Sequence, residues 1–172
     1  MQNWVKWLIL GVLSAIFGLF ALGNAVAASI AVTLLTGILF VIAGAGQVIV
    51  GLGEAGAGHK IFTILLGLLM LVLGISFISN PLEGTVSLAL LVTILLAAGG
   101  LVRLTLAFAM RQTPFFWTML FSGALTVLLA GYILANFAGV SVALLGILLG
   151  VELIFNGAGL IAFALFLRRS RI

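Results

Sequence analysis

The stretch Leu8-Ile9-Leu10-Gly11 returns in altered form as Ile64-Leu65-Leu66-Gly67 and again as Leu120-Phe121-Ser122-Gly123. Three asparagines keep the same spacing, since 80 − 24 and 136 − 80 both equal 56; they are Asn24, Asn80 and Asn136. A period of this length is typical of repeat arrays. We therefore predict one structural unit written three times, over approximately residues 4–59, 60–115 and 116–172, within a single transmembrane domain of residues 1–172.

The composition excludes a soluble array, because the chain is 65% hydrophobic and only 6% charged, whereas about a quarter of a soluble domain is charged. Six apolar runs cover approximately residues 7–23, 30–52, 61–79, 85–109, 115–135 and 140–167. Most approach the roughly 20 residues that a helix needs to cross a bilayer. They lack the period-two alternation of barrel strands, and a membrane span must satisfy its own backbone hydrogen bonds. The sequence therefore predicts an all-α integral membrane protein.

Six transmembrane helices in three copies give each copy two spans, which we expect to form a helical hairpin. With an even number of spans, successive copies enter the membrane in the same direction. These are parallel repeats, unlike the inverted repeats of many transporters. The predicted architecture is three tandem parallel-repeat hairpins, with the lipid bilayer as their environment.

The chain has a net charge of +4, and its loop cations all lie on one side of the predicted membrane topology. The loop and terminal cations fall at the two ends of the chain or in the even-numbered connections: Lys6, Lys60, Arg111, Arg168, Arg169 and Arg171. By the positive-inside rule, both termini face the cytoplasm. The charge therefore indicates topology and no nucleic-acid partner. A cleaved signal ending at Ala25-Val26-Ala27 is the alternative, but the same helix recurs over 61–79 and 117–135, where cleavage cannot remove it.

The asparagines open the tight outer turns, which we expect at Asn24 to Ser29, Asn80-Pro81-Leu82-Glu83-Gly84 and Asn136-Phe137-Ala138-Gly139. Asparagine tolerates a left-handed helix end, and proline cannot continue a helix. Each asparagine is therefore predicted to cap a helix. The functional alternative is an outward-facing asparagine ring that binds a solute.

Glycine is abundant, with 22 residues. Gly11 with Gly18, and Gly67 with Gly74, mark seven-residue stripes on helix faces, while Gly146 and Gly150 are four residues apart. Small residues let membrane helices approach closely, so we interpret these faces as packing surfaces. The sequence leaves open whether they meet within one chain, in a homo-oligomer or against other membrane proteins.

The loop Gly51-Leu52-Gly53-Glu54-Ala55-Gly56 matches the glycine pattern of dinucleotide-binding turns. That motif works between a strand and a helix, whereas here it ends a membrane helix, so we predict no cofactor. His59, Glu54 and Lys60 share this loop, and one histidine with one carboxylate gives too few ligands for a metal. We interpret them as a solvated loop. The chain has one histidine and three carboxylates. A nucleophile-base-orienter set would need more than one histidine or additional buried carboxylates, so we expect no enzyme activity.

Glu152 lies near the middle of the last apolar run, where a charged carboxylate costs about 2.5–3.5 kcal/mol. Asn156 follows one turn later on the same helix face, so we expect a short polar stripe that points away from lipid. Arg103 is the obvious ion-pair partner of Glu152. Alternatively, the long side chain of Arg103 extends to the cytoplasmic headgroups. Gln47 is the counterpart of Arg103 in the first copy, so we expect the two residues at the same depth in the membrane. These four residues predict an interior polar track, which serves as a structural clasp or as a proton or solute path, unless their placements are unrelated.

The glycine pairs Gly11 with Gly18 and Gly67 with Gly74, the turn Asn80-Pro81, and the glycines of the second helices, Gly44, Gly100 and Gly157, resemble the HdeD family of small bacterial acid-resistance membrane proteins. The resemblance covers nearly the whole chain. It implies a protein of the bacterial inner membrane that is associated with acid stress. We expect it to limit or direct proton movement. The alternatives are a structural or assembly module that binds other membrane proteins through its glycine faces, and, third, a small-solute transporter.

Overall fold

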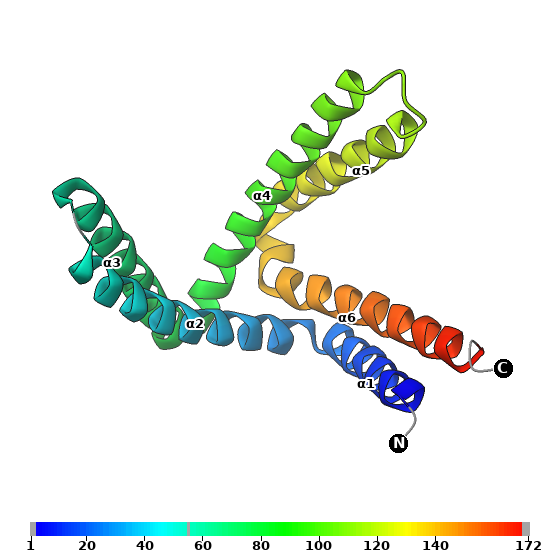
Figure 1. Cartoon of the computed structure of the whole chain (residues 1–172), viewed down its shortest axis with the longest axis horizontal. Coiled ribbons are helices and arrows are strands. Elements are labelled where there is room, and N and C mark those ends of the chain that lie inside the picture. Colours follow the sequence, from blue (N-terminus) through cyan, green and yellow to red (C-terminus); the bar gives the residue numbers. More distant parts are fainter. Residues whose placement is uncertain (1–2, 55, 170–172) are drawn as a thin grey trace. The chain divides into compact units, whose positions relative to one another are not determined.

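The computed structural model describes residues 3–54 and 56–169, which form six α-helices (Figure 1). They are α1 (Asn3–Gly23), α2 (Ala25–Gly53), α3 (Ala57–Ser79), α4 (Pro81–Ala109), α5 (Phe116–Ala135) and α6 (Phe137–Arg169). All six are long and apolar enough to cross a membrane, and the described residues contain no strand. The predicted all-α fold with six spans is confirmed.

The chain divides into two compact units. The first unit holds residues 1–84 and 143–172, and the second holds residues 85–142. The first unit therefore contains α1, α2, α3 and most of α6. The second contains most of α4, all of α5 and the first turns of α6.

The outer turns are shorter than expected, because a new helix begins directly after each asparagine. Proline is favoured at the first helical position, where its fixed φ fits and its missing N–H is not needed. Pro81 therefore starts α4 instead of blocking it. The expected left-handed conformation is also absent: the φ angles of Asn24, Asn80 and Asn136 are −131°, −130° and −114°.

Backbone N–H groups of these asparagines continue the preceding helix. Asn80 N–H donates to the Ser76 carbonyl, and Asn136 N–H donates to the Tyr132 carbonyl. The side-chain amide of Asn136 also donates to the Tyr132 carbonyl, at 3.0 Å. The asparagines thus end α1, α3 and α5 by supplying donors to carbonyls that the helix end would leave free.

Glycines form the seam of two antiparallel helix pairs in the first unit. In the pair of α1 with α6, a Cβ added at Gly11 would lie 2.8 Å from the Gly157 carbonyl oxygen, and one at Gly18 would lie 2.8 Å from that of Gly150. In the pair of α2 with α3, Gly44 meets Gly67 in the same way, at 2.7 Å. Because glycine lacks a Cβ, the two backbones of each pair come into direct contact.

Two hydroxyl groups, one partly buried and one fully buried, form hydrogen bonds between helices of the first unit. The Ser14 hydroxyl of α1 donates to the Leu153 carbonyl of α6, at 2.8 Å. The Gly146 N–H of α6 donates to the Ser29 hydroxyl of α2, at 2.7 Å, and Ser29 is fully buried. Hydroxyl contacts of this kind hold membrane helices together where apolar contact alone gives no preference over lipid.

The second unit repeats the glycine seam between α4 and α5. A Cβ on Gly100 would meet Val127 at 2.7 Å and the Gly123 carbonyl oxygen at 3.2 Å. Seven residues along each helix, Thr93 and Ala130 replace a second glycine pair, and both are buried. The glycine faces therefore meet within one chain, the point that the sequence had left open.

Packed pairs and sequence copies are offset by one helix. The pairs of α2 with α3 and α4 with α5 cross the copy boundaries at 59/60 and 115/116, and α1 packs against α6 from the last copy. Burial nevertheless follows the repeat. Two sets of buried residues recur at intervals of 56: Ala21, Phe77 and Ile133, and Ser29, Thr85 and Ser141. The hydroxyl set, Ser29, Thr85 and Ser141, shares the interval of 56 residues and could have been found in the sequence. It was missed because sequence reasoning considered only the asparagines, the glycines and the charged or amide residues.

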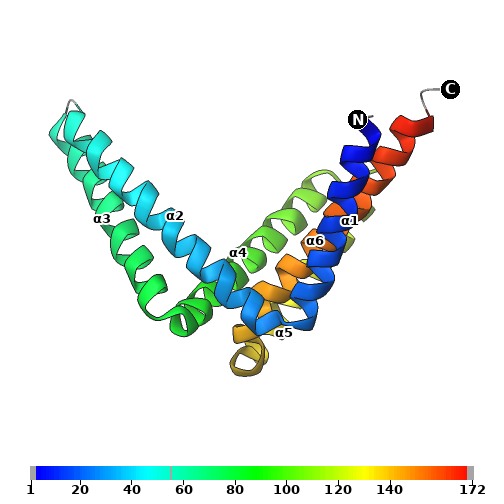
Figure 2. The same cartoon turned by 90° about the horizontal axis from the view of Figure 1, so that it is seen from below.

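The two ends of the described chain lie at the same end of the α1 and α6 pair (Figure 2). The Arg168 guanidinium lies 5.3 Å from the centre of the Trp4 ring. One turn further in, the rings of Trp7 and Phe163 meet edge to face at 5.6 Å. These contacts hold the two described ends of the chain together at one end of the α1 and α6 pair. The predicted orientation of the termini in the membrane stays a prediction. Arg171 lies outside the described residues.

Candidate functional site

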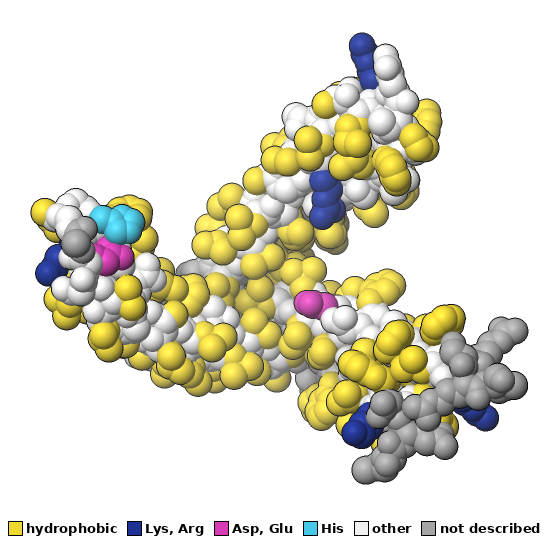
Figure 3. Space-filling view, in the orientation of Figure 1, with side chains coloured by type: hydrophobic (Ala, Val, Ile, Leu, Met, Phe, Trp, Pro, Cys, Tyr) yellow, Lys and Arg dark blue, Asp and Glu magenta, His cyan; other side chains and the backbone are white. Residues whose placement is uncertain are grey.

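A polar pocket lies at the loop end of the α2 and α3 pair, in the first unit. Its volume is about 440 Å³. Its polar side chains are Gln47, Glu54, His59 and Thr63. Figure 3 shows the chain's single histidine beside an acidic side chain at this end of the molecule. We call these four residues the loop cluster.

The chain reaches this arrangement through a glycine turn. Helix α2 ends at Gly53, and Glu54 is extended, with φ −72° and ψ 141°. Gly56 has a φ of 115°, the one positive φ among the described residues. A side chain at that position would be strained. Gly56 therefore reverses the chain so that α3 starts at Ala57 and turns His59 back toward Glu54.

Both oxygens of the Glu54 carboxylate face partners in the cluster. The Thr63 hydroxyl donates to Oε2 at 3.0 Å, and Nε2 of His59 lies 3.6 Å from Oε1. The Glu54 side chain is only 24% exposed, whereas that of His59 is 74% exposed. Lys60 uses its ammonium elsewhere, on the Leu52 carbonyl at 3.1 Å. The loop cluster is thus a half-buried carboxylate with a solvent-facing imidazole at its mouth.

Gln47 lies deeper in the same pocket, seven residues before Glu54 on α2, or about 10 Å along the helix axis. It places an amide at the end of the pocket that is farther from the loop. A neighbouring imidazole and carboxylate can exchange a proton once they approach to about 2.6–3.2 Å or are joined by one water. Among the described residues no three metal-ligating side chains come together.

The prediction of a solvated loop for His59 and Glu54 missed this cluster. The missing signal was Thr63, which follows His59 by four residues and so lies on the same face of α3. A threonine in an apolar helix draws little attention, because its hydroxyl is usually satisfied by the backbone one turn earlier. Here it donates to a carboxylate that sequence reasoning had left in solvent.

The other predicted site residues do not join the loop cluster. Glu152 and Asn156 lie exposed on one face of α6, so the polar stripe exists but faces outward on the first unit. Neither lines the pocket that contains Gln47. Arg103 is exposed on α4, in the second unit. Its pairing with Glu152 stays a prediction.

Comparison with known proteins gives two kinds of match, a family model and curated relatives. A family model described as a short repeat of unknown function (DUF308) matches residues 9–79 and 65–135, which begin 56 residues apart. Three curated relatives are each named Protein HdeD, from Escherichia coli strain K12, Escherichia coli O157:H7 and Shigella flexneri, and each is 32% identical over 117 residues. The match covers 65% of this chain and 62% of each relative, which is less than two thirds of the relative's length. No solved structure matches.

Proposed function

We propose, from the family of this chain, that it protects a bacterial inner membrane during acid stress by limiting or directing proton movement. The chain belongs to the DUF308 short-repeat family. Its similarity to HdeD supports the expected HdeD-family assignment. The observation that carries this proposal is the loop cluster. It is a group of side chains able to take up and pass a proton, at the end of two helices that can span the membrane.

The difference in exposure between His59 and Glu54 gives proton transfer through the loop cluster a direction. His59 is the more exposed group, so a proton from solution reaches its imidazole before it reaches Glu54. A proton taken up at Nε2 can pass to Oε1 of Glu54, leaving a neutral imidazole and a neutral carboxyl group. The Thr63 hydroxyl donates to Oε2 and so holds the Glu54 carboxylate in the orientation in which Oε1 faces His59. An imidazolium that keeps its proton instead pairs with Glu54 and closes the mouth of the pocket.

His59→Ala and Glu54→Gln are expected to lower survival in acid, because the first removes the proton donor and the second the acceptor. In proteoliposomes containing a pH-sensitive dye, proton flux should change by roughly tenfold or more, since a positioned acid or base contributes about 10²–10⁴-fold to proton transfer. Survival is counted in cells that lack their own copy of the gene.

Lys60→Gln is the matched control, since it removes a charge from the same loop but leaves the carboxylate and imidazole in place. It should behave as the unsubstituted protein does. If all three variants protect equally at equal expression, the loop cluster has no part in acid protection.

Assembly through glycine faces, the alternative role, has less support. Gly11, Gly18, Gly44, Gly67 and Gly100 all contact another helix of the same chain. A partner could reach those faces only by opening a helix pair. We propose a non-enzymatic role within the membrane.

We further propose that both termini and the loop around Lys60 face the cytoplasm. Single cysteines at Glu83 and Ala138, both exposed beside outer turns, should react with an impermeant maleimide added to intact cells. A cysteine at His59 should react only after the cells are opened. The chain has no natural cysteine to interfere. Labelling at His59 together with protection of Glu83 and Ala138 would reverse the topology.

A further inference from the structure

The pocket of the loop cluster lies between two facing stripes of side chains. Every third or fourth residue lines it, from Ala43 to Glu54 along α2 and its C-terminal cap, and from His59 to Leu66 along α3. Residues at this spacing share one helix face. The pocket is therefore a feature of the packed α2 and α3 pair, with polar side chains set between apolar walls.

The polar chemistry of this pocket is not repeated in the other copies. Met110 and Phe166 stand at one and two intervals of 56 residues after Glu54, and Met119 stands one interval after Thr63. The pairs of α4 with α5 and α1 with α6 nevertheless keep the glycine seam. Pairing of the helices therefore does not require a carboxylate, and the loop cluster has a role other than packing.

Two polar groups of the pocket have no hydrogen-bond partner among the described residues. Oε2 of Glu54 accepts from Thr63, but Oε1 lies 3.6 Å from Nε2 of His59, beyond the range of about 2.7–3.2 Å for such a bond. The half-buried Gln47 amide forms no hydrogen bond with another residue of the described chain. Polar groups held away from bulk water cost free energy until a partner satisfies them.

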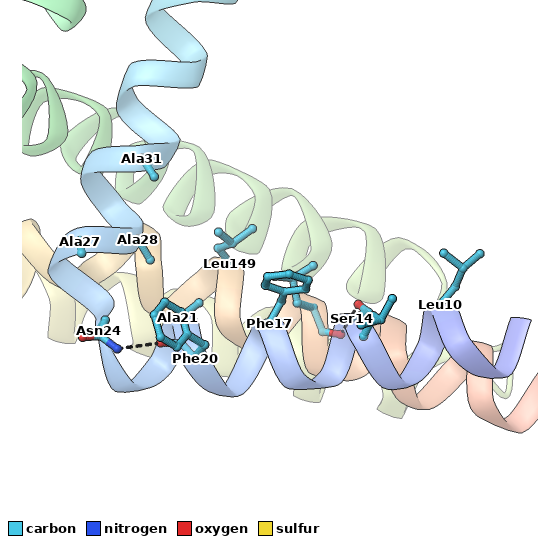
Figure 4. A pocket seen from close by; sticks show the side chains of 12 residues that line it. Leu10, Ser14, Phe17, Phe20, Ala21, Asn24, Ala27, Ala28, Ala31 and Leu149 are labelled. Carbon is cyan, nitrogen blue, oxygen red and sulfur yellow. Dashed lines mark hydrogen bonds between the residues drawn. The ribbon is translucent and has the colours of Figure 1, made fainter. Parts of the chain in front are cut away.

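The apolar groove between α1, α2 and α6 differs in this respect (Figure 4). Its Ser14 hydroxyl donates to the Leu153 carbonyl, and its Asn24 amide donates to the Phe20 carbonyl at 3.4 Å. The polar side chains of the groove are thus satisfied within the chain. Of these two cavities, the pocket of the loop cluster is the one that presents polar groups without partners.

The free carboxylate oxygen favours one kind of cation. Because Thr63 occupies Oε2 of Glu54, Oε1 offers contact at a single point, which suits an ammonium ion better than a bidentate guanidinium. A calcium ion takes about six to eight oxygen ligands, and no three metal-ligating side chains come together in the described part of the chain. The apolar walls add contact for a hydrocarbon attached to the ammonium group.

We infer that this pocket binds a primary ammonium ion that carries a short hydrocarbon body. The ammonium group donates to Oε1 of Glu54, and the hydrocarbon lies against Phe62 and Leu66. Gln47 binds a polar group at the far end of the ligand. A protonated His59 competes for the same carboxylate oxygen. The site uses residues of the proposed proton transfer but does not depend on that function.

The test measures dissociation constants for the full chain in phosphatidylcholine nanodiscs, by saturation-transfer NMR. Pentylamine should bind saturably, the amino alcohol of the same length should bind more tightly, and pentanol, which lacks the charge, should not saturate. Glu54→Gln should weaken pentylamine binding by about tenfold or more, because hydrogen bonds between charged groups are the strong ones. Glu83→Gln, which removes an exposed carboxylate beside an outer turn, is the matched control and should leave the constant unchanged.

Gln47→Leu tests the site if Glu54→Gln lowers the folded yield. It should remove the preference for the amino alcohol and retain the binding of pentylamine. Four results would each overturn the proposal: no saturable binding of pentylamine, equal binding of pentanol, equal constants with and without the Glu54 carboxylate, or a preference for the amino alcohol that persists in Gln47→Leu.

Two sources carry this chemistry, a free amine in water and the headgroup of phosphatidylethanolamine. The quaternary headgroup of phosphatidylcholine has no N–H donor. Replacing half of the phosphatidylcholine with phosphatidylethanolamine should therefore weaken pentylamine binding if the lipid headgroup occupies the pocket. An unchanged constant assigns the pocket to free amines. Both results support Glu54 as the acceptor of a primary ammonium group.

His59→Ala separates this site from the proposed proton transfer. It removes the proton donor, so acid survival should fall, but it keeps Oε1 of Glu54 and removes a competing cation, so amine binding should tighten. Tighter amine binding with unchanged survival would refute the proton transfer and support the ammonium site. Lower survival, with no amine binding to the unsubstituted protein, would support the proton transfer and overturn the ammonium site.

Discussion

Replacing Gly44 with valine is expected to cause one of the largest losses of folded protein of any single substitution in this chain. A Cβ at Gly44 would lie 2.7 Å from the Gly67 carbonyl oxygen and 2.9 Å from the Leu71 amide nitrogen. Both are backbone atoms, which cannot rotate away as a side chain can. Overpacking typically costs about 1–3 kcal/mol, and separation of α2 from α3 would add to it.

Gly46 provides the matched control, because nothing lies within 4 Å of a Cβ built there. Gly44→Val and Gly46→Val place the same β-branched residue in the same helix, so they share any cost of helix propensity. The measurement is the midpoint of thermal unfolding in detergent, with folded yield beside it. We expect a large loss for Gly44→Val and little change for Gly46→Val. Equal midpoints would show that α2 and α3 do not pack as described.

Glu152 is expected to tolerate a neutral side chain and reject a permanent cation. Glu152→Gln keeps the shape and removes the charge, and we expect acid survival and folded yield to stay unchanged. Glu152→Arg puts a guanidinium, which is not deprotonated in proteins, near the middle of α6. Insertion scales assign about 2.5–3.5 kcal/mol to such a charge at the helix centre.

Ala109→Arg is the control, because it adds the same cation at the end of α4, where the side chain can reach the headgroups. Folded yield and acid survival are measured for all three variants. If Glu152→Gln expresses normally but loses acid protection, a permanently neutral Glu152 is excluded. An ion pair with Arg103, or a titrating path, then explains the residue better.

The helices could be predicted from the sequence because apolar length alone determines them in a membrane. Their packing partners could not. The interval of 56 residues indicates which positions are equivalent, but a glycine face on α2 fits α1 and α3 equally well in the sequence. The structure resolves this through backbone contacts such as Gly44 with Gly67. Pro81 was misinterpreted because the same ring that ends one helix is favoured at the start of the next.

The loop cluster was missed for a different reason. Its members, Glu54, His59 and Thr63, are ordinary residues, and only the turn at Gly56 brings the carboxylate back onto α3. The rule based on the number of ligands led to the prediction of no metal site, but that rule does not address proton transfer, which needs only two groups. Glu152, by contrast, stood out because of its depth, and the structure places it outside any described cluster.

The offset between sequence copies and packed pairs has a consequence for how the chain can be divided. A fragment that contains one sequence copy, with one odd and one even helix, would separate glycine faces from the partners that they have in the full chain. A fragment that contains α2 and α3 would keep the contact of Gly44 with Gly67. The unit of sequence repetition is thus not the unit of helix packing.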